Sequence, residues 1–202
     1  MKLYFTPGAC SMAAHIALRE TGLPFDIEKV DLATHKTAKG EDYMKINPKG
    51  YVPAIKLDSG DLLSEVAVVL QYIAEQKPAS GLVPPVGTMD HYREIEWLNF
   101  ISSEVHKQFG PMFNPKIPED WKQNQLNTLA RRFDYLTIQL KGKQFLMGDK
   151  FTVADAYLFT VLNWCNFLNV DLSKWPALKD YMARVSGRAA VKEAMKAEGL
   201  IQ

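Results

Sequence analysis

The sequence predicts an α/β domain followed by an all-α domain. Strand and helix patterns alternate over about the first 80 residues, whereas the chain after about residue 88 has helical periodicity throughout. Residues 77–88, KPASGLVPPVGT, are rich in proline, glycine and serine, which is typical of a linker. With 202 residues, the chain is long enough to bury two small cores. We therefore expect one domain over 1–80 and a helical domain over 88–202, joined by a linker over 77–88.

The first domain is expected to have the order β-α-β-α-β-β-α, a small mixed sheet with helices packed on it. The runs KLYF and FDIEKVDL flank a stretch of helical spacing, which favours a parallel pair of strands. Asp58-Ser59-Gly60 is a turn sequence suited to a hairpin. The expected strands span 2–5, 25–32, 52–57 and 61–64, and the expected helices span 12–20, 39–46 and 64–76.

The second half contains helical patterns and no internal repeat. Thr152 and Asp155 stand at the spacing of a capping box, in which each residue bonds to the backbone of the other. We interpret this motif as structural, a helix start rather than a site. The expected helices span 89–113, 118–141, 153–168, 176–186 and 188–198.

Charge and cysteine content exclude several kinds of partner. Lys plus Arg number 24 against 23 Asp plus Glu, a net charge of +1, which predicts binding neither to nucleic acid nor to a membrane surface. The first apolar run stops at Thr6-Pro7, before it could form a secretory segment. Two cysteines 155 positions apart form no disulfide framework and match no zinc spacing. We expect a cytoplasmic protein without a metal.

Cys10 follows a Pro-Gly turn and precedes the first predicted helix. The free amides and the positive dipole end of a helix start would favour its thiolate and lower its pKa below the ordinary value. The other interpretation is a small buried side chain. Position 13 is alanine, so any disulfide chemistry needs an external thiol. Cys165, on an apolar helix, is interpreted as a packing residue.

Two further stretches of the first domain have both a binding and a structural interpretation. Pro53 lacks an N–H and leaves Val52 extended, with main-chain groups available to pair with a bound peptide, or it is a plain strand-edge proline. Ser64 is expected to cap the next helix. Amides after that cap could hold a carboxylate and Glu65 could hold an ammonium group, although a capping serine followed by an acid is also ordinary helix chemistry.

In the second domain, a polar row runs beside a buried stripe. Leu98, Ile101 and Val105 have the spacing of a buried helix face, and Asn99, Ser103 and His106, at steps of four and three residues, form a polar row beside it. His106 could donate a hydrogen bond to a thiolate or act as a general acid, or it could be a structural histidine.

The ordered set of motifs resembles the bacterial beta class of glutathione transferases. The resemblance covers MKLYFTPGACSMAAHIALRETGLPF, KINPKGYVPAIKLDSGDLLSEVAVVLQYI and GDKFTVADAYLF, and so extends over essentially the whole chain. It implies a thioredoxin-like domain followed by a helical domain, a homodimer, and glutathione as cosubstrate.

The resemblance also implies roles for individual residues. Cys10 would face the glutathione sulfur and be able to form a mixed disulfide with it. Position 35 is histidine where the family often has lysine, and position 66 is valine, which can offer only its main chain to the glutamyl carboxylate. The implied catalytic residues are Cys10 and His106, and the implied glutathione site comprises Cys10, His35, Val52, Pro53 as a cis-proline, Glu65, Val66, Asn99, Ser103, Glu104 and His106. Phe109, Phe113, Trp164 and Phe167 could line the pocket for a hydrophobic substrate, although such spacing also occurs in helix cores.

The implied activity is conjugation of glutathione to hydrophobic electrophiles, which makes the protein an enzyme. Two alternatives stay open. One is glutathione-dependent thiol-disulfide exchange through a mixed disulfide on Cys10. The other is a carrier that binds hydrophobic ligands with little turnover.

Overall fold

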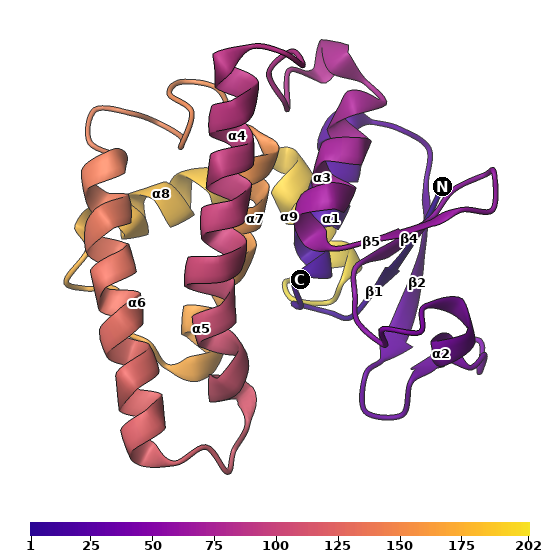
Figure 1. Ribbon diagram of the computed structural model, residues 1–202, viewed down its shortest axis with the longest axis horizontal. Coiled ribbons are helices and arrows are strands. Elements are labelled where there is room, and N and C mark those ends of the chain that lie inside the picture. Colours follow the sequence, from indigo (N-terminus) through magenta and orange to yellow (C-terminus); the bar gives the residue numbers. More distant parts are fainter. The chain divides into compact units, whose positions relative to one another are not determined.

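The computed structural model describes residues 1–202, which divide into two compact units (Figure 1). The first unit comprises Met1–Val83 together with Arg188–Gln202, and the second comprises Pro84–Gly187. The division at 83 and 84 falls inside the expected linker. The last helix differs from expectation, because the segment from Arg188 onward belongs to the first unit. None of the helices combines the length and apolar character needed to cross a membrane.

The first unit contains a five-stranded mixed sheet with the strand order β3-β2-β1-β4-β5. Strands β1 and β2 are parallel, as expected from the helix that connects them, and the other neighbouring pairs are antiparallel. Its elements are β1 (Lys2–Phe5), α1 (Ser11–Thr21), β2 (Asp26–Asp31), β3 (Lys36–Thr37), α2 (Tyr43–Ile46), β4 (Ala54–Lys56), β5 (Leu62–Ser64), α3 (Val66–Glu75), η1 (Pro78–Ser80) and α9 (Ala189–Ala197).

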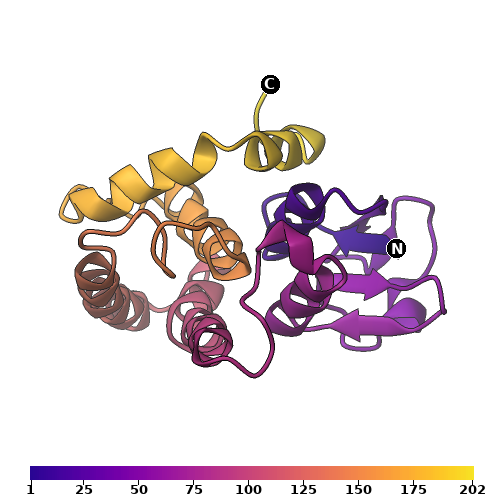
Figure 2. The same ribbon diagram turned by 90° about the horizontal axis from the view of Figure 1, so that it is seen from above.

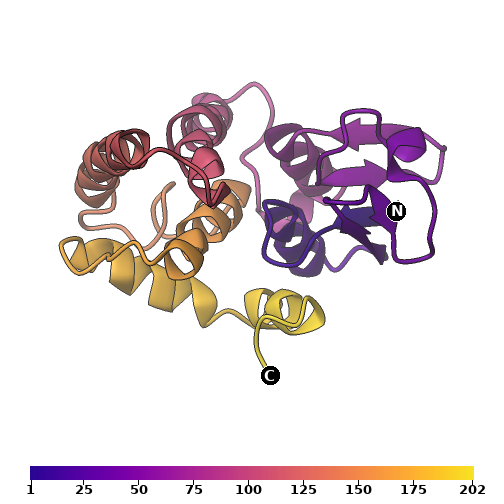
Figure 3. The same cartoon turned by 90° about the horizontal axis from the view of Figure 1, so that it is seen from below.

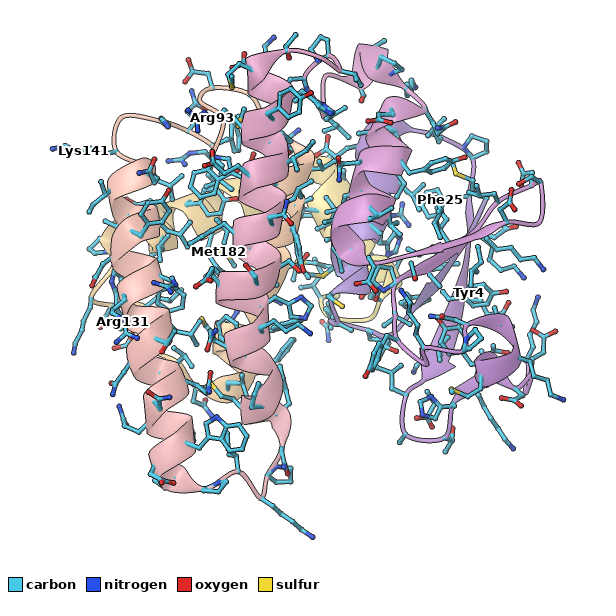
Figure 4. All side chains as sticks on the ribbon, in the orientation of Figure 1. Tyr4, Phe25, Arg93, Arg131, Lys141 and Met182 are labelled. Atoms are coloured by element: carbon cyan, nitrogen blue, oxygen red, sulfur yellow. The ribbon has the colours of Figure 1, made fainter.

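Helices cover both faces of this sheet. Helices α1 and α3 lie side by side against one face, and α9 packs on α1 (Figures 2 and 3). On the other face, Tyr4 of β1, labelled in Figure 4, packs against Tyr43 of α2 with ring centroids 5.6 Å apart. Because α1 has an almost fully buried surface and begins directly after Cys10, the core of this unit fixes the position of that cysteine.

The second unit consists of helices packed around α7. Residues 153–165 of this helix are all buried, which explains why the sequence there is apolar on every side. Thr152 and Asp155 form the expected capping box. The elements are α4 (Met89–Phe100), η2 (Ile101–His106), α5 (Lys107–Phe109), η3 (Gly110–Phe113), α6 (Glu119–Gln139), α7 (Val153–Leu168) and α8 (Pro176–Ser186).

The helix expected over 89–113 is continuous but irregular. Its central segment, η2, is a π-helix, and its last turn, η3, is a 3-10 helix. The expected buried stripe is confirmed, since Leu98, Ile101 and Val105 are fully buried. A π-helical turn changes the direction in which the following side chains point around the helix axis, compared with a regular α-helix, and such turns are frequent at functional sites. Ser103, Glu104 and His106 all lie in this segment.

Candidate functional site

The loop before α1 places Cys10 at the N-cap of that helix. Gly8 has a φ of 71°, a conformation that glycine adopts without strain, and the amide of Ala9 closes the turn on the carbonyl of Thr6 at 3.0 Å. The Cys10 side chain is half-buried and makes no cap hydrogen bond to the helix. Its Sγ instead lies 3.0 Å from the main-chain oxygen of Val52. This contact suits a protonated thiol as donor, whereas the helix start favours the thiolate.

The backbone on the other side of Cys10 is held rigidly. The peptide bond between Val52 and Pro53 is cis. Just before it, the carbonyl of Tyr51 accepts hydrogen bonds from the Tyr43 hydroxyl and from the Asn47 side-chain amide, both at 2.8 Å. Val52 is therefore fixed beside Cys10, and the structure brings these two predicted site residues into direct contact.

Ser64 is not the cap of α3, contrary to the sequence interpretation. It is the last residue of β5 and pairs with Ala54 of β4, so that the chain is still extended at Ser64. The cap is Glu65, with φ 72° and ψ 118°, a conformation that is costly for a residue with a side chain. This turn leaves the amide of Val66 at the start of α3, beside the strand that follows Pro53.

Glu65 and His35 have neighbours that the sequence did not predict. The Glu65 carboxylate is mostly exposed and forms an ion pair with Lys49 at 2.7 Å. His35 has a positive φ of 51°, and its Nδ1 is buried without a hydrogen-bond partner. Gly50 packs against this ring, because a Cβ at position 50 would lie only 3.0 Å from the His35 Cε1 atom. The loop 47–51 therefore lies between the two predicted glutathione-binding residues.

A buried polar network connects the last helix of the chain to the Cys10 loop. Glu198, directly after α9, accepts a hydrogen bond from the Gly8 amide at 2.9 Å through Oε2. Its Oε1 lies 2.9 Å from Nδ1 of His15, and Nε2 of His15 accepts from Arg19 Nε at 3.0 Å. The side chains of Glu198 and His15 are fully buried. This arrangement fixes the turn that presents Cys10.

Glu198→Gln should lower the free energy of unfolding by about 2 kcal/mol, because an amide group then faces one of two buried donors, the Gly8 amide or His15. It should also speed hydrogen exchange of the Gly8 amide, measured by NMR. The matched control is Glu193→Gln, since Glu193 pairs with Arg19 but is mostly exposed. Equal exchange rates at Gly8 in the two variants would contradict a role for Glu198 in holding the loop.

In the second unit, three of the predicted polar residues are engaged locally. The Asn99 side chain donates to the carbonyl of Ile95 at 3.0 Å, and the Ser103 hydroxyl donates to the carbonyl of Asn99 at 2.9 Å. Glu104 forms an ion pair with Arg132 of α6, whose Nε lies 2.9 Å from Oε2. Each of the three side chains therefore has a partner within the second unit.

His106 lies in a different environment from the rest of the polar row. Its Nδ1 is 2.7 Å from the hydroxyl of Tyr157, and its ring packs edge-on against Trp164 with centroids 4.8 Å apart. Burial, with a smaller effect from the positive charge of Lys107, lowers the pKa of His106 to about 4. A neutral imidazole is therefore present near pH 7, and the sequence interpretation of His106 as a general acid is not supported.

The four predicted aromatic residues are only partly brought together. Trp164 makes edge-on contacts with Phe109 and Phe113, at 5.8 and 5.5 Å between centroids. Phe109 is fully buried and belongs to the core, whereas Phe113 and Phe167 are about half exposed. The predicted pocket residues thus divide into a buried pair, Phe109 and Trp164, and an exposed pair.

A hollow that the sequence did not predict lies between α4 and α6. It has a volume of about 450 Å³, and Trp97, Phe100 and Tyr135 form part of its wall. Their ring centroids are 5.1 to 6.0 Å apart. Arg93 of α4, labelled in Figure 4, lines the same hollow. No group of three or more histidine, cysteine or acidic side chains is arranged to hold a metal ion.

Comparison with known proteins finds one family whose models match both halves of the chain. The family model for the glutathione S-transferase N-terminal domain matches residues 8–76, and the model for the C-terminal domain matches residues 100–189. Glutathione S-transferase GstA of Escherichia coli O157:H7 is 43% identical over 200 residues, which cover 99% of this chain and 100% of that protein. The chain belongs to the glutathione S-transferase family. This confirms the family and the fold class expected from the sequence.

Two solved structures extend the comparison. The beta class glutathione S-transferase of Sphingomonas chungbukensis is 46% identical, with a TM-score of 0.96 and full coverage of both chains. A sphingomonad glutathione S-transferase complexed with glutathione is also 46% identical, with a TM-score of 0.95 and full coverage of both chains. Similarity to the beta class is therefore confirmed.

Several residues that contact predicted site residues or the Cys10 loop escaped the sequence analysis. Glu198, Lys49 and Tyr157 each contact a residue far away in the chain, so no local spacing connects the partners. The sequence does contain one weak indication for His15. It is a polar side chain within an otherwise apolar stretch, MAAHIAL, so it is expected to be buried and to need a polar partner.

Proposed function

We propose that this protein conjugates glutathione to hydrophobic electrophiles, with glutathione bound beside Cys10. The observation that carries the proposal is the contact between Cys10 and Val52, next to Pro53 and to the start of α3. The cysteinyl unit of glutathione would pair with the main chain of Val52. The γ-glutamyl carboxylate would take the amide of Val66, which a helix N-terminus makes favourable for an anion.

Charged groups around this turn would bind the rest of the tripeptide. The Glu65 carboxylate would form an ion pair with the ammonium group of the glutamyl unit. Its exposed ion pair with Lys49 would be lost when glutathione binds. His35 would contact the glycyl carboxylate. The second unit would contribute Asn99, Ser103, Glu104 and His106 to the glutathione site, and Phe113, Trp164 and Phe167 to the hydrophobic substrate pocket with Phe109 behind them.

The proposed reaction needs a glutathione thiolate. Its sulfur attacks an electrophilic carbon, a carbon–sulfur bond forms, and with an aryl halide the carbon–halogen bond breaks and halide leaves. The thiol proton passes to solvent. Cys10, beside that sulfur, would stabilise the thiolate as a hydrogen-bond donor, consistent with its donation to the Val52 carbonyl here.

The second candidate is thiol-disulfide exchange, favoured by the half-buried Cys10 at a helix start. The Cys10 thiolate would attack the glutathione sulfur of a disulfide between glutathione and a second thiol, which breaks that disulfide, forms a mixed disulfide between Cys10 and glutathione, and releases the second thiol. A second glutathione thiolate would then release oxidised glutathione and regenerate Cys10.

We also propose that the protein works as a homodimer in the cytoplasm. Helices α4 and α6 expose large apolar side chains, among them Tyr92 and Ile138, which are more than half exposed and are typical of a contact surface. A reducing compartment would keep the thiol of Cys10 available.

Cys10→Ala should separate the two candidate reactions. We expect the variant to lose disulfide reduction with glutathione and to keep conjugation to an activated aryl halide within about tenfold of the wild-type rate, because a neighbouring donor is replaceable but a covalent nucleophile is not. Steady-state kinetics of both reactions measures this. Cys165→Ala is the matched control, since burial raises the pKa of this thiol to about 12 and both activities should persist.

Other outcomes would redirect the proposal. Loss of both activities in Cys10→Ala would make the cysteine essential to conjugation as well. Negligible wild-type activity in both assays, together with binding of apolar dyes, would contradict an enzymatic function and favour a carrier.

A further inference from the structure

His106 is enclosed by aromatic side chains of its own unit. Its ring packs edge-on against Trp164 and against Tyr157, with centroids 4.8 and 5.8 Å away, and its Nδ1 lies 2.7 Å from the Tyr157 hydroxyl oxygen. Because the pKa of His106 is about 4, its ring is neutral near pH 7 and carries one proton on one of its two nitrogens. Its chemistry then depends on which nitrogen holds that proton.

The contact with Tyr157 favours one of the two nitrogens as the site of this proton. A phenol is a strong neutral donor, and an unprotonated imidazole nitrogen is a strong neutral acceptor. When the hydroxyl of Tyr157 donates to Nδ1, the ring proton is left on Nε2. We propose that Tyr157 is a positioning residue that holds His106 as the neutral Nε2–H tautomer, so that His106 serves the proposed transferase reaction as an uncharged hydrogen-bond donor.

The two tautomers would act on a thiolate in opposite ways. With the proton on Nε2, that nitrogen donates a hydrogen bond to an anionic sulfur. With the proton on Nδ1, Nε2 would present a lone pair and repel the anion. An uncharged donor also keeps its function over the whole pH range in which the thiolate exists, because its donation requires no second proton on the ring. Tyr157 thus acts through His106, and the assignment of this role rests on the proposed function.

Two other histidines have contacts that favour a proton on Nδ1 instead, and they provide internal references. Nε2 of His15 accepts from the guanidinium of Arg19, which is always a donor, and this leaves Nδ1, facing Glu198, as the position for a proton. Nδ1 of His91 lies 3.2 Å from the carbonyl oxygen of Pro84, which can only accept. The three rings should therefore differ in one NMR experiment.

Long-range proton–nitrogen NMR of the uniformly 15N-labelled protein at pH 7.5 tests the tautomer without reference to activity. His106 is assigned by the signals that disappear in His106→Gln. We expect a protonated Nε2 in His106 and a protonated Nδ1 in His15 and His91. In Tyr157→Phe, the His106 signals should shift toward a mixture of tautomers, whereas those of His15 and His91 stay unchanged. A protonated Nδ1 in wild-type His106 would overturn the proposal.

Kinetics then tests the positioning role. Tyr157→Phe should lower kcat for conjugation about tenfold, the value of one lost hydrogen-bond arrangement, with KM for glutathione changed less than twofold. Tyr135→Phe, at a half-exposed tyrosine of α6, is the control and should match the wild type. Unchanged kcat in a Tyr157→Phe protein with altered tautomers would overturn the positioning role. Absence of any wild-type conjugation would instead refute the proposed function, while the NMR result still decides the tautomer.

Discussion

Asp155→Ala should lower the free energy of unfolding by about 4 kcal/mol, the range typical of breaking a buried polar network. Asp155 is fully buried at the start of α7. Its Oδ1 accepts from the amide of Leu146 at 2.9 Å and from the Tyr181 hydroxyl at 3.0 Å. Its Oδ2 accepts from the amide of Thr152 at 2.9 Å and from the Thr152 hydroxyl at 3.2 Å. Alanine would leave all of these donors inside the second unit without their acceptor.

The size of this effect distinguishes a local cap from a tertiary network. A capping interaction alone contributes about 1 kcal/mol, which is what the motif in the sequence predicts. The bonds to Leu146 and Tyr181 join the start of α7 to the preceding loop and to α8, and each unsatisfied buried donor costs about 1–3 kcal/mol. We therefore expect a loss well above that of an ordinary helix cap.

Urea unfolding at pH 7.5, followed by circular dichroism at one protein concentration, measures the loss. Asp155→Asn is the graded variant, because asparagine keeps the volume and one acceptor oxygen and should fall between alanine and the wild type. Asp171→Ala is the matched control. Asp171 also accepts from a nearby amide, that of Ser173 at 2.8 Å, but that bond is exposed, so the change should stay within about 0.5 kcal/mol. Similar losses for Asp155→Ala and Asp171→Ala would refute the network.

The sequence predicted those parts of the molecule whose partners are close in the chain. The capping box, the parallel pair β1 and β2, the hairpin β4–β5 and the stripe of Leu98, Ile101 and Val105 all follow from local spacing, and the structure contains each of them. The N-cap at Ser64 was wrong for a tertiary reason. Pairing with Ala54 keeps Ser64 in the sheet, which moves the cap to Glu65.

The features that escaped prediction depend on contacts between distant segments. Strand β3 has only two residues, too few for a periodic pattern. Helix α9 has the same helical pattern in its sequence as the helices before it. The carboxylate of Glu198, which follows α9, contacts Gly8 and His15, and the segment belongs to the first unit. At the candidate site, residue types could be predicted, whereas the partners that set their protonation, such as Tyr157 for His106, could not.

Glu94 is a second buried carboxyl group at the start of α7, contributed by α4. It is fully buried, and its Oε1 accepts from the amide of Ala154 at 2.8 Å, while its Oε2 is buried without a hydrogen-bond partner. Burial, reinforced by the negative charge of Asp155, raises the pKa of Glu94 to about 8. The side chain therefore holds a proton in the folded protein at neutral pH.

This proton makes stability depend on pH in a definite direction. Below about pH 4.5, the carboxyl group is protonated in both the folded and the unfolded chain. Between that pH and about pH 8, the unfolded chain releases a proton that the folded chain retains, so that stability falls as the pH rises. The loss from this one group should reach about 3 kcal/mol near pH 7. Asp155, whose pKa burial raises to about 6, acts in the same direction at lower pH.

Glu94→Gln should remove this dependence and stabilise the protein by about 3 kcal/mol at pH 7 and about 4 kcal/mol at pH 8, with little difference from the wild type near pH 5. Glutamine has the shape of the protonated acid, so its oxygen can still accept from Ala154. Urea unfolding at several pH values gives the difference between variant and wild type, in which the contribution of Asp155 largely cancels. Glu96→Gln, at an exposed position of the same helix paired with Arg93, should leave the pH profile unchanged. A constant difference between Glu94→Gln and the wild type from pH 5 to 8 would show that Glu94 is ionised in the folded protein. The group that accepts from the Ala154 amide at the start of α7 would then be a carboxylate and not a neutral carboxyl group.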